Sequence, residues 1–146
     1  MTDCTLCERL TSSAPPPGGW IYQDALWAVS AHPGVAAPGW LAIQTIRHVE
    51  TLAELDHDEA TSLGVLVRDV STCLQVTTGA DRTYTYALGE GVRHVHVLVG
   101  VPLSPSNPAD RGAQLLSRIL ARDSILEQPE LRDHVCSVLA QTIRNG

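Results

Sequence analysis

The chain has 146 residues, 44% of them hydrophobic and 18% charged, and a formal net charge of −6. This length and composition indicate one globular, ordered domain. The ten basic residues are all arginines scattered singly along the chain, so neither nucleic acid nor an anionic membrane surface is an expected partner. The sequence has no apolar run of about 18 residues. It also lacks a basic N-terminal segment followed by an apolar one. We therefore expect no membrane span and no secretory signal, and we expect a cytoplasmic location.

The first half of the chain predicts short strands followed by one long helix. A Pro- and Gly-rich loop over 13–19 precedes three β-rich segments, at 20–23, 26–31 and 40–45. The spacing of apolar residues then changes to three and four, which predicts an amphipathic helix over 56–77. Asp56 is its expected N-cap, with Glu59 in the capping-box position and Gly79 at the exit.

The second half predicts a β-hairpin followed by helices. Segments 82–88 and 92–101 are β-rich and flank a glycine turn, and prolines interrupt the chain over 102–108. Helices are expected over 109–122 and 129–143. Hairpins rather than crossovers indicate an α+β fold: an antiparallel sheet of about five strands with the long helix and the C-terminal helices packed on it. We expect a single domain over 1–146, with a helical extension from about 109.

A pair of cysteines two residues apart, Cys4 and Cys7, opens the chain. Such a pair occurs as half of a zinc site, as a redox pair or by chance. No strand precedes it, which disfavours the redox interpretation, whereas a zinc site needs two further ligands. Cys73 and Cys136 lie in predicted helices and are expected to be small core residues.

The histidines fall into two groups. His94 and His96 share one predicted strand, so their rings are expected side by side on one face. That arrangement is typical of an exposed polar face, of a metal site or of a nucleophilic site. His57 and His134 neighbour acids and are expected to be solvated, and His32 has no partner in sequence.

Several motifs, in order, resemble those of the histidine triad (HIT) family. After the cysteine pair come Pro38-Gly39-Trp40-Leu41-Ala42-Ile43, then Arg47-His48-Val49, and finally His94-Val95-His96-Val97-Leu98 with Pro102 shortly after. The resemblance covers the chain from Cys4 to Pro102. It implies a HIT-like fold, a homodimer and a nucleotide or nucleotide conjugate as substrate.

The resemblance also implies residue roles. The zinc-containing members hold the metal with the residues that match Cys4, Cys7, His48 and His94. Such a set is closed and therefore structural. The middle histidine of the signature, here His96, is the family's nucleophile, which attacks the α-phosphorus of a nucleotide ester, anhydride or phosphoramidate and forms a nucleotidyl-histidine.

Three expected substrate-binding positions depart from the family pattern. Leu98 replaces the third histidine, Glu90 stands where hydrolases carry glutamine, and Ser30 is near the position of the ribose-binding acid. Moving the signature back by two residues would make His94 the nucleophile but would remove a zinc ligand. The sequence thus leaves three functions open: a nucleotidyl hydrolase or transferase, a zinc-stabilised nucleotide-binding module or scaffold without activity, and an enzyme acting on a non-nucleotide phosphoester.

Overall fold

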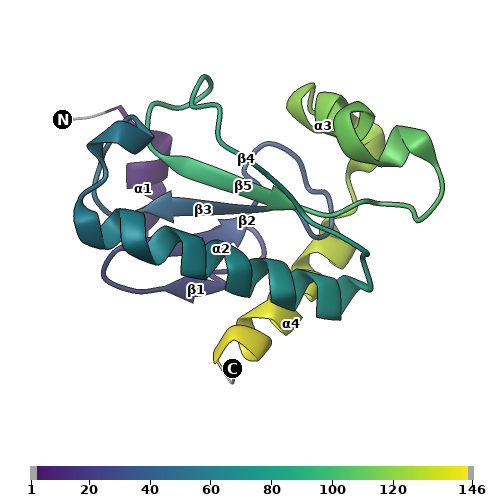
Figure 1. Cartoon of the computed structure of the whole chain (residues 1–146), viewed down its shortest axis with the longest axis horizontal. Helices are drawn as coiled ribbons and strands as arrows, with labels where there is room; N and C mark the ends of the chain where they lie inside the picture. Colours follow the sequence, from purple (N-terminus) through teal and green to yellow (C-terminus); the bar gives the residue numbers. More distant parts are fainter. Residues whose placement is uncertain (1–2, 145–146) are drawn as a thin grey trace.

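A computed structural model describes residues 3–144. It contains an antiparallel five-stranded sheet with the strand order β1-β2-β3-β5-β4 (Figure 1). The strands are Tyr22–Gln23 (β1), Trp27–Ala31 (β2), Leu41–Thr45 (β3), Tyr84–Tyr86 (β4) and His96–Gly100 (β5). The predicted α+β fold with about five strands is confirmed. The first two and last two residues of the predicted domain lie outside the described residues.

Four α-helices accompany the sheet: Thr5–Thr11 (α1), His57–Thr78 (α2), Gly112–Leu120 (α3) and Pro129–Arg144 (α4). Helix α2 begins and ends as predicted. The Asp56 side chain accepts a hydrogen bond from the Glu59 amide, the Glu59 carboxylate accepts one from the Asp56 amide, and Gly79 ends the helix with φ 73°. No helix in the described part of the chain is long and apolar enough to cross a membrane.

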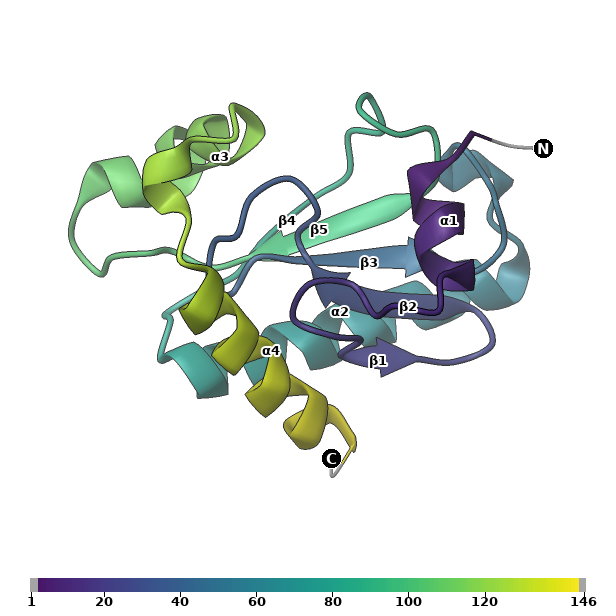
Figure 2. The same ribbon diagram turned by 180° about the vertical axis from the view of Figure 1, so that it is seen from behind.

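The two faces of the sheet differ in what covers them. Helices α2 and α4 pack on one face, and the main core lies between them and the strands, with Val70, Leu74 and Leu139 facing Val29 and Ile43. Helix α1 lies on the opposite face (Figure 2). That second face carries small or polar residues in register on β2 and β3, namely Ala28, Ser30, Ala42 and Gln44. Small side chains leave room there for helix α1 and for cavities.

A second apolar cluster surrounds Trp40 at the end of the sheet nearest α3. Trp40 is fully buried, and its indole N–H donates to the Val101 carbonyl at 3.0 Å. A Cβ atom on Gly100 would overlap the Trp40 ring, so this strand residue has to be glycine. Leu115 and Ile119 of α3 complete the cluster.

The structure corrects the predicted secondary structure in three places. Strand β5 begins at His96 rather than at 92, because the His94 amide bonds to the Val92 carbonyl at 2.9 Å and turns the chain there. His94 therefore does not share a strand face with His96. The predicted helix over 109–122 is a 3₁₀ turn, Pro108–Asp110, followed by α3, since Gly112 has φ 57°. Helix α1 was not predicted at all.

Candidate metal centre and the cavities around His96

The four predicted metal ligands come together at one end of the sheet. Cys4 is the N-cap of α1 and Cys7 lies in the first turn of that helix, whereas His48 follows β3 and His94 precedes β5. Their ligand atoms all lie within 4.8 Å of one another. The Nδ1 atom of His94 is 3.4 Å from each cysteine sulfur, and Nδ1 of His48 is 3.3 Å from the Cys7 sulfur. A tetrahedral zinc ion separates sulfur and nitrogen ligands by about 3.5 Å, given its usual bond lengths, so this donor set fits zinc.

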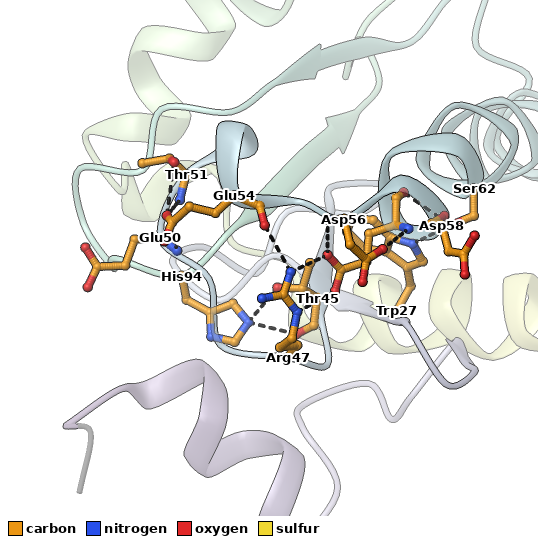
Figure 3. Close-up of polar contacts among 11 residues, drawn as sticks. Trp27, Thr45, Arg47, Glu50, Thr51, Glu54, Asp56, Asp58, Ser62 and His94 are labelled. Atoms are coloured by element: carbon orange, nitrogen blue, oxygen red, sulfur yellow. Dashed lines mark hydrogen bonds and ion pairs between the residues drawn. The ribbon is translucent and has the colours of Figure 1, made fainter.

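The His94 ring is held in the orientation that a metal ligand needs. Its Nε2–H donates to the Thr45 carbonyl at 2.7 Å (Figure 3). The Nδ1 atom, 3.4 Å from each cysteine sulfur, then has its lone pair free for a metal. A backbone carbonyl on the second ring nitrogen is the usual support of a metal-binding histidine. Burial lowers the pKa of His94, which favours the neutral ring.

An ion pair with a buried carboxylate fixes the segment that carries His48. The Arg47 guanidinium donates to both oxygens of Glu59, at 3.1 and 2.7 Å, and Glu59 is only 1% exposed (Figure 3). Glu59 also caps α2, so this one carboxylate ties the chain beside His48 to the start of that helix. The hydrogen bonds from Arg47 lower the pKa of Glu59.

His96 has the tautomer of a nucleophile. Its Nδ1 lies 2.6 Å from the His94 carbonyl oxygen, which can only accept, so Nδ1 carries a proton and Nε2 is the nitrogen with the lone pair in the neutral ring. The half-buried His96 lines two cavities, one of about 390 Å³ and one of about 460 Å³. His94 thus serves both regions: its ring faces the cysteines and its carbonyl orients His96.

The smaller cavity is acidic and partly apolar. Glu50 and Glu90 line it together with Arg93 and the exposed Leu52 and Leu88. Glu90 therefore lies where a ligand of His96 would pass. Arg93 approaches Glu50, at 3.9 Å, rather than Glu90.

The larger cavity is lined by Arg9, Arg122 and Arg132 and by a histidine that sequence reasoning left without a role, His32. The Gly34 amide donates to His32 Nδ1 at 3.0 Å, so His32 Nε2–H donates to the Tyr86 hydroxyl, 3.2 Å away. Burial and nearby positive charges lower the pKa of His32 to about 4. In the sequence, the only indication that His32 belongs to this site is its position two residues after Ser30, which places both side chains on the same face of the sheet.

Ser30 and Leu98 line neither cavity. Tyr86, Leu98, Ala42 and Ser30 form one row across the second face of the sheet. Ser30 is fully buried, and its hydroxyl accepts a hydrogen bond from Arg9 Nη2 at 3.0 Å. Leu98 is 4% exposed. Tyr86, from β4, is also hydrogen-bonded to His32, which follows β2.

Comparison with solved structures identifies the architecture. A hypothetical histidine triad nucleotide-binding protein from Sulfolobus tokodaii superposes with a TM-score of 0.73 at 19% identity, over 97% of this chain and 93% of that one. The chain has the histidine triad fold. A zinc-bound histidine triad family protein from Mycobacterium smegmatis matches with a TM-score of 0.73 at 15% identity, over 98% of this chain and 94% of that one.

A HIT-like protein involved in cell-cycle regulation from Bartonella henselae also matches, with a TM-score of 0.71 at 10% identity, over 96% of both chains. In sequence, no family model and no curated protein matches the chain. The likeness is therefore one of fold, and it agrees with the motif order from Cys4 to Pro102.

Proposed function

We propose that this protein binds nucleotides and acts as a nucleotidyl hydrolase or transferase with His96 as nucleophile. One observation carries the proposal: His96 lines both cavities and its Nδ1 donates to the His94 carbonyl, which leaves Nε2 as the nitrogen for nucleophilic attack. A nucleophilic imidazole needs that tautomer and an accessible partner. The printed name of the Sulfolobus tokodaii neighbour, a nucleotide-binding protein, supports the substrate class.

The reaction has two displacements. The Nε2 lone pair of His96 forms a bond to the α-phosphorus, and the bond from phosphorus to the leaving oxygen or nitrogen breaks, its electron pair going to the leaving group, which takes up a proton from water. The positive charge that develops on the ring is stabilised by the His94 carbonyl through Nδ1–H. Water or another acceptor then attacks phosphorus, loses a proton and releases His96.

Cys4, Cys7, His48 and His94 would hold a structural zinc ion in this proposal, since four protein ligands leave no open position. The donor set, two thiols and two imidazoles, fits zinc, and the printed title of the Mycobacterium smegmatis neighbour names zinc. The metal would hold α1 against the sheet. A homodimer and a cytoplasmic location stay predictions.

The test is turnover of nucleoside phosphoramidates, dinucleoside polyphosphates and sugar nucleotides. We expect His96→Ala to lower the rate on the preferred substrate by at least about a thousandfold, because the covalent route is lost. His134→Ala, a change of an exposed histidine on α4, is the matched control and should leave the rate unchanged. Wild-type protein without turnover on any of these substrates would refute the enzymatic proposal.

The burial of Leu98 favours a second candidate, a zinc-stabilised nucleotide-binding module without catalysis. A leucine cannot donate a hydrogen bond to a phosphate, and at 4% exposure it also cannot contact one directly. Titration calorimetry with purine nucleotides, combined with the turnover assay, separates the two candidates. Binding without turnover identifies the module, whereas a folded protein that binds no purine nucleotide excludes it.

A further inference from the structure

The larger cavity beside His96 carries positive charge that the protein does not neutralise. Arg9 and Arg122 form no ion pair within residues 3–144. Arg132 pairs with Asp133 at 2.8 Å, and Glu127 is the one acid among the lining residues that the structure describes. In a chain with a net charge of −6, two unpaired arginines in one cavity are unexpected. Unpaired guanidinium groups with free donors are the usual ligands of phosphate and carboxylate.

Arg9 is fixed in place but keeps unused donors. Its Nη2 donates to Ser30 at 3.0 Å, and its guanidinium carbon lies 6.0 Å from the centre of the Trp20 ring. Its Nη1 is buried and has no hydrogen-bond partner among residues 3–144. A buried N–H group without an acceptor is unfavourable, and a bound water or anion that accepts its hydrogen bond would remove that cost. Ser30 thus positions Arg9 rather than contacting a ligand itself.

Arg122 approaches the same cavity from the C-terminal part of the chain. Its backbone has φ 54°, a left-handed conformation that is uncommon for a residue other than glycine. Its side chain lies over the loop after β2, where a Cβ atom on Gly34 would be 3.4 Å from Arg122 Nε and 3.1 Å from His32 Cε1. Burial lowers the pKa of His32, and the charges of Arg122 and Arg9 lower it further. Both guanidinium groups therefore lie close to His32.

His96 therefore separates two cavities of unlike charge, since Glu50 and Glu90 line the other one. We propose that the cavity lined by Arg9 and Arg122 binds a second anionic group of the substrate, a phosphate or a carboxylate, on one side of the reacting phosphorus. The neutral or cationic part of the substrate then occupies the acidic cavity. This inference rests on the proposed function in taking His96 as the point of reaction.

Titration calorimetry with AMP, ADP, inorganic pyrophosphate and malonate tests the inference. We expect ADP to bind at least about tenfold more tightly than AMP, because a charge-assisted hydrogen bond to a second anion has that worth. Arg9→Gln and Arg122→Gln should each weaken ADP binding about tenfold and AMP binding much less. Arg68→Gln, which removes an exposed arginine of α2, is the matched control and should leave both affinities unchanged. If pyrophosphate competes with ADP better than malonate does, the site is a phosphate site. If malonate competes better, it is a carboxylate site.

Equal affinities for AMP and ADP in the wild type, or ADP affinity unchanged in both arginine variants, would overturn the inference even if turnover depends on His96. Conversely, pyrophosphate binding that needs Arg9 and Arg122, in a protein without turnover, would support the anion site and refute the enzymatic proposal. Arg122 is exposed, so Arg122→Gln tests the site even if Arg9→Gln disturbs α1.

Discussion

The Cys–His cluster (Cys4, Cys7, His48 and His94) and the larger cavity share residues of helix α1 and both adjoin His96, but their polar groups differ in how they are satisfied. In the cluster, four donor atoms from three chain segments face one another within 4.8 Å, and Thr45 takes the spare donor of His94. In the cavity, Arg9 retains a buried nitrogen without a partner. One region directs its polar groups inward, as a structural site does, and the other leaves them available to a ligand.

The largest expected effect is on the cluster. Cys7→Ser should abolish zinc binding and release α1, because a structural zinc site contributes on the order of 10 kcal/mol or more of free energy in small domains. Zinc content by elemental analysis and the thermal unfolding midpoint are the measurements. Cys73→Ser, a half-buried cysteine of α2 outside the cluster, should keep its zinc. A zinc content near one per chain in Cys7→Ser would contradict the assignment.

The next effect concerns the support beside His48. Glu59→Ala leaves three donors without their acceptor, the Nε and Nη2 groups of Arg47 and the Asp56 amide, so the free energy of unfolding should fall by about 3 kcal/mol. Because the pKa of Glu59 is lower in the folded state, its contribution is complete above its usual pKa and disappears as the pH falls through the folded value. Urea unfolding at neutral pH and near pH 4 measures both. Glu54→Ala, an exposed acid nearby, is the control, and an equal loss there would refute a special role of Glu59.

A smaller effect tests the position that the third histidine would occupy. Leu98→His should lower the free energy of unfolding by about 1–3 kcal/mol, because a polar ring would enter a position that is only 4% exposed. It should not accelerate turnover. Chemical denaturation and the rate on the preferred substrate are the readouts, with Leu98→Met as the volume-matched control. A stable Leu98→His variant with faster turnover would show that the cavity extends to this position.

The smallest effect is expected for Tyr86→Phe. It removes the hydrogen bond from His32 and should cost about 1 kcal/mol of unfolding free energy.

In the wild type, NMR titration should show His32 neutral down to about pH 4, since its pKa is lowered to about 4. Protonation of wild-type His32 near pH 6.5 would contradict the buried, positively charged surroundings described above.

The elements that could be predicted are those whose signals are local. Asp56, Glu59 and Gly79 identify the ends of α2 because caps depend on neighbouring residues. The cluster could be predicted because cysteine and histidine side chains at matched motif positions have few other uses. Neither His32 nor Arg9 could be assigned to the cavity, since its walls meet only through contacts between segments distant in sequence. The start of β5 was predicted too early for a similar reason. The Val95 amide bonds to the Val49 carbonyl, and no local sequence pattern indicates a contact between residues so far apart in the chain.

Helix α1 has only seven residues, about 10 Å of helix, and a helix so short is not stable in isolation. Its order depends on contacts with the rest of the fold: Cys4 and Cys7 at one end, the buried Leu6 with its carbonyl bonded to Gln44 in the middle, and the bond of Arg9 to Ser30 toward the other end. Two ligands that both require an ordered α1 share a single conformational equilibrium. Thermodynamic reciprocity then applies: whatever factor the metal adds to the affinity of the cavity for an anion, the anion adds to the affinity of the cluster for the metal.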